Sequence, residues 1–132
     1  MPRLIKAINT DSLFPNINKR GRKFYGANLI LVACKKSKIM DIDKANDDFC
    51  HYAIKASRRI GKAVVRNKIK RRLRHSIANI AKDDSLIRQF AILIIPKTNC
   101  AQMNFQTLQD EIYALFSNSC KNNFKGGKSL AQ

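Results

Sequence analysis

The widest gap in this sequence of 132 residues is the absence of acidic side chains from its centre. No Asp or Glu occurs between Asp48 and Asp83, so residues 49–82 lack the partners that form ion pairs along a helix. Over the whole chain, 26 Lys and Arg outnumber 9 Asp and Glu, which gives a formal net charge of +17. Because such a charge opposes compaction by self-repulsion, the sequence predicts a polyanionic partner.

Paired metal ligands and long apolar runs are also missing. The cysteines are widely spaced and form no Cys-x-x-Cys pair: Cys34, Cys50, Cys100 and Cys120. Zinc sites need ligands a few residues apart, so we predict no metal site and expect buried free thiols. No apolar run approaches the ~20 residues of a membrane span, and none of signal-peptide length precedes Asp11. We expect a cytoplasmic chain that does not contact a membrane.

Residues that could assemble an active site are scarce as well. The carboxylates between Asp41 and Asp48 crowd into a hydrophilic segment, which is typical of a solvated loop. His51 lies in a strand pattern and His75 in a helical one, and neither has a visible catalytic partner. No glycine-rich phosphate loop is present. We therefore predict no catalytic residue in this chain.

What the chain does contain is the patterning of a single mixed domain. We expect this domain over residues 1–120, followed by a flexible basic tail over 121–132. Apolar runs predict strands at 28–34, 49–57 and 90–95, and helical spacing predicts helices from about Lys62 to Lys82 and at 106–116. A short helical segment is expected from Asp11 or Ser12 to Gly21. Alternating strands and helices favour an α/β or α+β sandwich.

The long central helix combines one apolar side with a basic remainder. Its apolar residues recur at helical spacing and predict a buried stripe: Val65, Ile69, Leu73, Ile77 and Ile80. At 100° per residue, the side chains predicted to point away from this stripe are Asn67, Lys68, Arg71 and Arg74, whereas Arg66, Lys70 and Arg72 lie along its edges. A helix anchored in this way suits a phosphate backbone, and Arg adds bidentate phosphate geometry. The sequence therefore predicts an RNA or DNA interface.

From Ser57 to Arg74 the chain reads Ser-Arg-Arg-Ile-Gly-Lys-Ala-Val-Val-Arg-Asn-Lys-Ile-Lys-Arg-Arg-Leu-Arg. This segment resembles the pattern Ser-Lys-Lys-x-Gly-x-Ala-Val-x-Arg-Asn-Arg-x-Lys-Arg of the protein subunit of bacterial ribonuclease P. The resemblance extends over residues 10–120 through a Phe before Gly21, a strand ending in Ser57 and a closing helix. It implies an α+β fold (an α/β sandwich) with a mixed four-stranded sheet, three helices and a left-handed crossover, against the general preference.

The resemblance also implies a division of labour with RNA. A catalytic RNA would cleave precursor tRNA, with Mg²⁺ bound chiefly by that RNA and the substrate, and no obligate protein partner is expected. The chain would bind ribonuclease P RNA and the 5′ leader of precursor tRNA. The implied RNA-binding residues are Arg58, Arg59, Lys62, Arg66, Asn67, Lys68, Lys70, Arg71 and Arg74. The implied leader-binding residues are Phe14, Phe24, Tyr25 and Lys55.

The chain departs from the family pattern at several positions. Lys68 replaces an Arg, which keeps the charge and loses the fork geometry, and His75 stands where an acid often follows. Asn18 and Val32 occupy positions where the family often carries aromatic residues that stack on bases. Two alternatives stay open: a structural, ribosomal-type RNA-binding protein, and a nuclease that needs no RNA.

Overall fold

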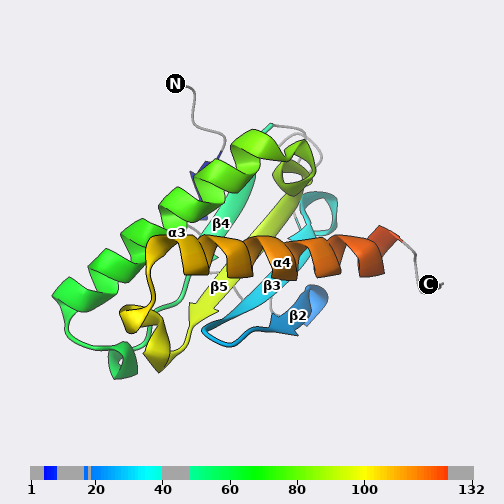
Figure 1. The fold of residues 1–132 in the computed structure, drawn as a ribbon. Helices are drawn as coiled ribbons and strands as arrows, with labels where there is room; N and C mark the ends of the chain where they lie inside the picture. Colours follow the sequence, from blue (N-terminus) through cyan, green and yellow to red (C-terminus); the bar gives the residue numbers. More distant parts are fainter. Residues whose placement is uncertain (1–4, 9–16, 18, 40–47, 125–132) are drawn as a thin grey trace.

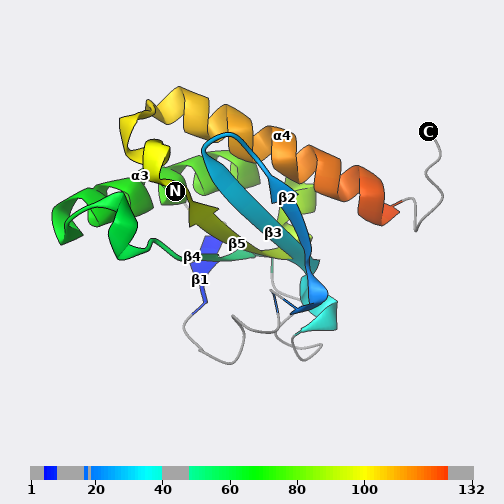
Figure 2. The ribbon, with the colours of Figure 1, turned by 90° about the horizontal axis from the view of Figure 1, so that it is seen from below.

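The computed structural model of the protein describes residues 5–8, 17, 19–39 and 48–124. Its strands are β1 (Ile5–Ala7), β2 (Arg22–Tyr25), β3 (Leu29–Lys35), β4 (Cys50–Ile54) and β5 (Phe90–Pro96). Two long helices, α3 (Ala63–Asp83) and α4 (Phe105–Phe124), lie on the same side of the sheet (Figures 1 and 2). Short 3-10 helices complete the order: η1 (Lys36–Lys38), η2 (Arg58–Ile60), η3 (Ser85–Gln89) and η4 (Thr98–Gln102).

The strands form one mixed sheet in the order β1-β4-β5-β3-β2. The β1–β4 and β4–β5 pairs are parallel, whereas the β5–β3 and β3–β2 pairs are antiparallel. The described residues thus give five strands where four were expected, because the three-residue β1 adds an edge to the sheet. In Figure 1 the parallel strands β4 and β5 both run toward the lower left, and α3 connects them in front of the sheet. For an observer who faces along the strands in this view, β5 lies on the left of β4. A crossover in front of the sheet that moves to the left is left-handed, as the resemblance implied.

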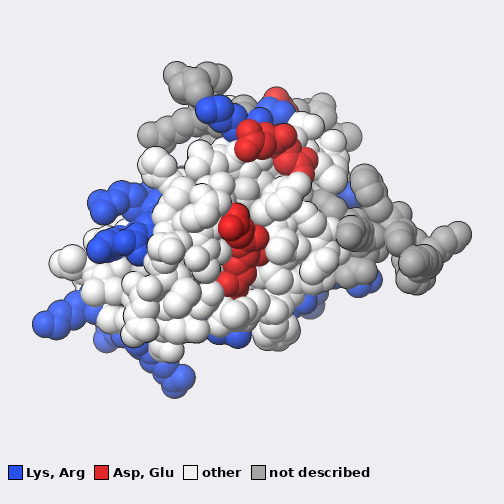
Figure 3. All heavy atoms as spheres, viewed as in Figure 1, with Lys and Arg blue, Asp and Glu red and all other residues white. Residues whose placement is uncertain are grey.

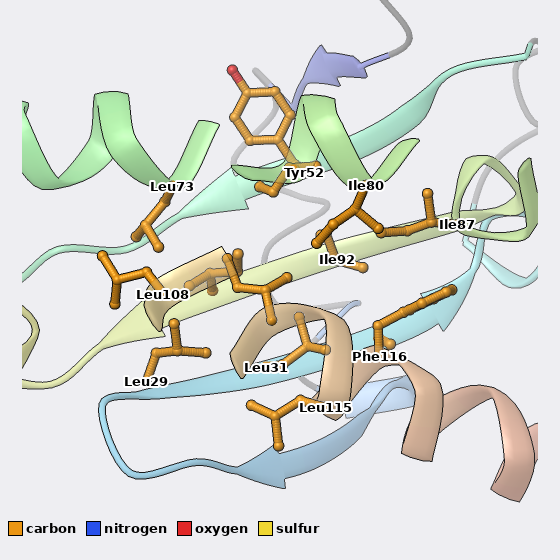
Figure 4. Packing of buried hydrophobic residues seen from close by; sticks show 14 of the residues in the cluster. Leu29, Leu31, Tyr52, Leu73, Ile80, Ile87, Ile92, Leu108, Leu115 and Phe116 are labelled. Atoms are coloured by element: carbon orange, nitrogen blue, oxygen red, sulfur yellow. The ribbon is translucent and has the colours of Figure 1, made fainter. Parts of the chain in front are cut away.

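The main core lies between the two helices and the sheet (Figure 4). The predicted stripe of α3 faces this core: Ile69, Leu73, Ile77 and Ile80 are buried, and Val65 packs at its margin. From α4, the residues buried against the sheet are Leu108, Ile112, Leu115 and Phe116. Fully burying an aliphatic or aromatic side chain of this size contributes about 1.5–3 kcal/mol, so this layer anchors both helices. The predicted phase of α3 is confirmed.

Hydrogen bonds from one carboxylate fasten α4 to the β2–β3 hairpin. Glu111 of α4 accepts from the backbone N–H of Asn28 at 2.8 Å, from the Asn28 side-chain amide at 2.7 Å and from the backbone N–H of Leu29 at 3.1 Å. The turn between the strands would otherwise leave these donors without partners beside a buried leucine. Glu111 thus sets the position of the hairpin relative to the helical layer.

The remaining elements differ from the prediction mainly in their limits. Of the short helix expected from Asp11 or Ser12 to Gly21, only residues 17, 19 and 20 are described, and these are helical. The structure therefore describes two long helices, α3 and α4, rather than three. The last helix extends to Phe124, so residues 121–124 of the expected tail are helical, and residues 125–132 lie outside the described part.

Cys34, Cys50 and Cys100 are free and buried, as expected. Burial raises the pKa of the Cys50 thiol to about 12 and that of the Cys100 thiol to about 11, so both stay protonated at neutral pH.

Within the described ranges, no helix has both the length and the apolar character that crossing a lipid bilayer requires.

Candidate nucleic-acid interface

The outward side of α3 and the turn before it form a continuous basic surface, which we call the basic face. Its residues are the nine predicted for RNA binding: Arg58, Arg59, Lys62, Arg66, Asn67, Lys68, Lys70, Arg71 and Arg74. Arg66 and Lys70 are half-buried along the edges of the helix, and the other seven are exposed. In the part of the chain that the structure describes, none of the nine belongs to an ion pair. Their charge is therefore available to a ligand.

The charge distribution over the surface shows how local this feature is. In Figure 3, Lys and Arg side chains project from the side of the molecule that the N-terminal part of α3 forms, whereas red side chains lie over α4 and near the other end of α3, which finishes in Asp83. A polyanion approaching the N-terminal part of α3 therefore meets cations without neighbouring carboxylates to repel it.

One arginine of the same run has a structural role instead. Arg72 lies along the edge of α3, and its guanidinium donates to the backbone carbonyl of Met103 at 3.0 Å. Ser76, one turn later, is buried and donates its hydroxyl to the Arg72 carbonyl at 3.0 Å. The first of these hydrogen bonds ties α3 to the segment that leads into α4, whereas the second lies within the helix. The contact with Met103 therefore helps to orient the basic face over the core.

A glycine sets the entry into α3. Gly61 joins η2 to the helix with a φ of +152°, a backbone conformation that residues with a Cβ rarely adopt. An added Cβ would also lie 3.1 Å from the Cβ of Val65. The turn it makes places Arg58 and Arg59 of η2 next to the start of the basic helix. The backbone conformation at this position and the nearby Val65 therefore explain why the segment from Ser57 to Arg74 has a glycine here.

The sheet face opposite the helices carries the second candidate surface. Strand alternation places Tyr25, Ile30 and Ile95 in one row across this face, because Tyr25 pairs with Ile30 and Ile30 pairs with Ile95. Lys55 continues the row, since its backbone N–H donates to the carbonyl of Ile94. Tyr25 is 68% exposed, Lys55 is exposed and the two isoleucines are half-buried. We call these four residues the open row.

The neighbouring part of the same face is closed. Val32, Ala53 and Leu93 are buried there together with Ile8 and Ile17. Val32 therefore packs in a small second core and cannot stack on a base, even though the family often has an aromatic residue at this position. The open row begins where this second core ends.

The predicted leader-binding residues do not all share this face. Phe24 points to the opposite side of β2 from Tyr25 and packs, half-buried, against the main core beside α4, so it does not belong to the open row although the sequence grouped it with Tyr25. The reason is that β2 was not predicted as a strand, so its alternation was not considered. Phe14 and Asn18 lie outside the described residues.

A basic hollow, separate from the basic face, was not predicted from the sequence. It has a volume of about 150 Å³ and is lined by Arg20, Arg22, Ala33, Cys34, Lys35 and Lys38. Arg20 and Lys38 lie close enough to Cys34 to offset part of the rise that burial causes in the pKa of its thiol. The signal that could have revealed it is the run Lys19-Arg20-Gly21-Arg22-Lys23. Its charge suits a further phosphate group.

The carboxylates of the described residues are not arranged to hold a metal ion. Asp48 pairs with Arg88 at 3.1 Å, Asp84 caps η3 by accepting from the backbone N–H of Leu86, and Glu111 fastens the hairpin. No group of three or more His, Cys, Asp or Glu comes together within the described ranges. A protein-held Mg²⁺ therefore does not fit the donors that this part of the chain offers.

Sequence comparisons relate the chain to one family. The family described as Ribonuclease P matches residues 4–119. The ribonuclease P protein component of Rickettsia prowazekii is 42% identical over 110 residues, which cover 82% of this chain and 89% of that protein. The corresponding component of Rickettsia typhi is 41% identical over 110 residues, with 82% and 92% covered.

Solved structures show the same fold. The Staphylococcus aureus RNase P protein superimposes with a TM-score of 0.67 at 22% identity, covering 85% of this chain and 93% of that one. The RNase P protein from Thermotoga maritima gives a TM-score of 0.64 at 21% identity, with 86% and 96% covered.

Proposed function

Because this chain belongs to the ribonuclease P protein family, we propose that its basic face binds ribonuclease P RNA and that its open row receives the 5′ leader of precursor tRNA. As a protein component of ribonuclease P, the chain is part of the endoribonuclease that processes tRNA 5′ ends. Contact with the RNA of that ribonucleoprotein follows from the family. The residues that make the contact, and the leader as a second ligand, are our proposal.

The cations of α3, which belong to no ion pair within the described residues, carry this proposal. They lie on a helix whose opposite side packs against the core, so the helix is already held in place when RNA binds. Each phosphate neutralised by such a surface releases counterions, which makes binding favourable and steeply dependent on salt. The arginines add the planar, bidentate geometry that suits phosphate oxygens.

The open row supports a separate role for the sheet. Tyr25 offers an exposed ring for stacking, and Lys55 offers a cation at the other end of the row. Along the chain, Lys55 comes three residues before Arg58, so the row leads into the basic face. A single strand lying on the sheet would thus contact one protein surface while the catalytic RNA contacts the other.

We propose that this chain leaves catalysis to RNA. Ribonuclease P is a metal-dependent ribonucleoprotein enzyme, and we propose that its metal is Mg²⁺ held chiefly by the RNA and the substrate. The protein's role would be to reduce repulsion between two polyanions by supplying cations of its own. We propose that the ribonucleoprotein acts in the cytoplasm.

Reconstitution with the cognate ribonuclease P RNA tests the proposal. We expect the protein alone to leave precursor tRNA intact, and the protein with the RNA to cleave at a lower Mg²⁺ concentration than the RNA alone. This advantage should shrink as Mg²⁺ rises, because free Mg²⁺ replaces the screening that the protein provides. Cleavage by the RNA-free protein would contradict the proposal and support a self-sufficient nuclease.

A second assay separates leader binding from a purely structural role. The reconstituted enzyme should bind precursor tRNA more tightly than tRNA without a leader, and Tyr25→Ala should reduce this difference by about 5- to 100-fold if one base stacks on the ring. Tyr113→Ala is the matched control, since Tyr113 is 48% exposed on α4, away from the sheet face. Equal binding of both tRNAs would favour the structural, ribosomal-type alternative.

A further inference from the structure

A cavity between α3 and the edge strand β1 is unaccounted for by phosphate binding alone. Its volume is about 660 Å³, and its lining residues come from three elements: Ile5 and Ala7 of β1, Tyr52 of β4, and Arg71, Arg74, His75 and Ala78 of α3. The four α3 residues follow the spacing i, i+3, i+4 and i+7, so they form one side of the helix. This size is within the range of small-molecule sites.

The lining combines aliphatic walls with a cationic rim. Ile5 and Ala78, which are half-buried, and Ala7, which is exposed, supply the aliphatic surface, whereas Arg71, Arg74 and His75 are exposed at the rim. The Tyr52 ring is part of the main core and only 8% exposed. Its hydroxyl points away from the other labelled core side chains in Figure 4, and Tyr52 is one of the residues that line the cavity. No hydrogen bond within the described residues engages that hydroxyl.

A flat polar ring linked to a phosphate fits this combination. Phosphate alone would be satisfied by the rim and would gain nothing from the aliphatic walls or the phenol. A nucleobase offers an apolar face to the walls and hydrogen-bonding edges to the Tyr52 hydroxyl, while its phosphate reaches the two guanidinium groups. Unpaired nucleotides cost the least to unstack, so they are the expected donors of such a base.

We propose that the cavity between α3 and β1 binds the base of one unpaired nucleotide of the RNA that α3 contacts, with its phosphate on Arg71 and Arg74. This inference rests on the proposed RNA binding and adds a site that reads a base within it. The basic face then recognises more than charge. It selects RNA that presents an extruded nucleotide to the cavity while its phosphate contacts Arg71 and Arg74.

Filling the cavity tests the proposal on the full chain. Ala78→Leu places three additional carbons in the cavity and should lower affinity for ribonuclease P RNA by about 5- to 100-fold, the loss expected for one base contact. Because no charge changes, the reduction should be the same at every salt concentration. Ala114→Leu is the matched control, since Ala114 is exposed on α4 outside the cavity. An Ala78→Leu variant that melts like the parent and binds equally well would overturn the proposal.

A second readout does not depend on a core-neighbouring substitution. The chain has three tyrosines, so 3-fluorotyrosine labelling gives three ¹⁹F resonances, which single Tyr→Phe variants assign. Adding 5′-AMP should shift the Tyr52 resonance and leave that of Tyr113 unchanged. Ribose 5-phosphate, which has no base, should shift Tyr52 much less. Equal shifts from both compounds, or none at Tyr52, would show that no base enters the cavity.

These outcomes separate the two proposals. If the parent chain shows no saturable binding to ribonuclease P RNA, the proposed function itself fails. If the parent binds and the cavity variant binds equally, only the base site fails.

Discussion

The two long helices cover the same face of the sheet and have nearly the same length, yet their outward sides are opposite in character. Helix α3 contains seven Lys and Arg and one Asp in 21 residues. Helix α4 contains one Lys, one Asp and one Glu in 20 residues. Both bury leucine and isoleucine against the strands. Covering the sheet therefore does not require a basic helix.

This contrast makes α4 an internal control for α3. Packing explains the inward side of each helix, but only an external ligand explains why one of them concentrates cations without nearby acids. The acids of α4 have local partners: Glu111 holds the hairpin, and Asp110 accepts from Gln106 at 2.9 Å. The difference in charge between the outward sides of α3 and α4 thus reflects what each side contacts and is not a requirement of the fold.

The largest expected effect is on the inward sides, where the helices should behave alike. Leu73→Ala in α3 and Leu108→Ala in α4 each remove a fully buried side chain from the same core. Each should lower the free energy of unfolding by about 2–5 kcal/mol, measured by urea denaturation. If one helix tolerates the change and the other does not, the two do not share one core and the comparison is broken.

The next effect concerns the hairpin contact of α4. Glu111→Ala leaves the Asn28 and Leu29 donors without their carboxylate, so we expect a loss of about 1–3 kcal/mol in unfolding free energy. Asp110→Ala, beside it in the sequence, should change stability by less than about 0.5 kcal/mol because Asp110 is exposed. Equal losses would show that α4 carries its acids for general electrostatics instead.

Binding of ribonuclease P RNA should distinguish the outward side of α3 from that of α4. Arg66→Ala and Arg71→Ala on α3 should each weaken binding to ribonuclease P RNA by about 3- to 30-fold and reduce the slope of log affinity against log salt by about 1. Gln106→Ala, exposed on α4, should change neither quantity. Titrations at several salt concentrations, with melting curves as a folding control, give both numbers. An α4 substitution that weakened binding as much would contradict a one-sided interface.

The smallest effect is the response of the free protein to salt. Arg66, Lys70 and Arg74 are like charges at four-residue spacing, and each such pair costs a helix about 0.2–0.5 kcal/mol. Raising salt should therefore stabilise the RNA-free protein slightly, by screening these pairs. Lys70→Gln should reduce that gain. A protein whose melting temperature fell on adding salt, with Lys70→Gln showing the same slope, would refute this account.

The sequence was sufficient where periodicity was strong. The spacing of Ile69, Leu73 and Ile77 fixed the rotation of α3, and therefore the exposure of Lys68 and Arg71, before any tertiary contact was known. The continuous apolar runs likewise predicted β3 and β5 to within a residue or two. In these segments the local pattern and the tertiary environment favour the same structure.

The rest depended on pairing that the sequence does not display. The four residues of β2 include two cations, and they form a strand because β3 offers an edge to pair with. Without that strand, Phe24 and Tyr25 could not be assigned to opposite faces. The cavity beside α3 depends in the same way on β1, a three-residue strand whose position comes from pairing with β4. Long-range contacts, not local propensity, determine both surfaces.

The acid-free stretch from residue 49 to 82 also has a consequence for the amount of protein a cell maintains. Because RNA relieves the repulsion that the unassembled subunit bears, binding should shift the folding equilibrium in favour of the assembled form. Copies made in excess of their RNA would then unfold more often and be removed sooner by proteases that act on opened chains. The same charges that create the interface would thereby match the supply of the subunit to the supply of its RNA.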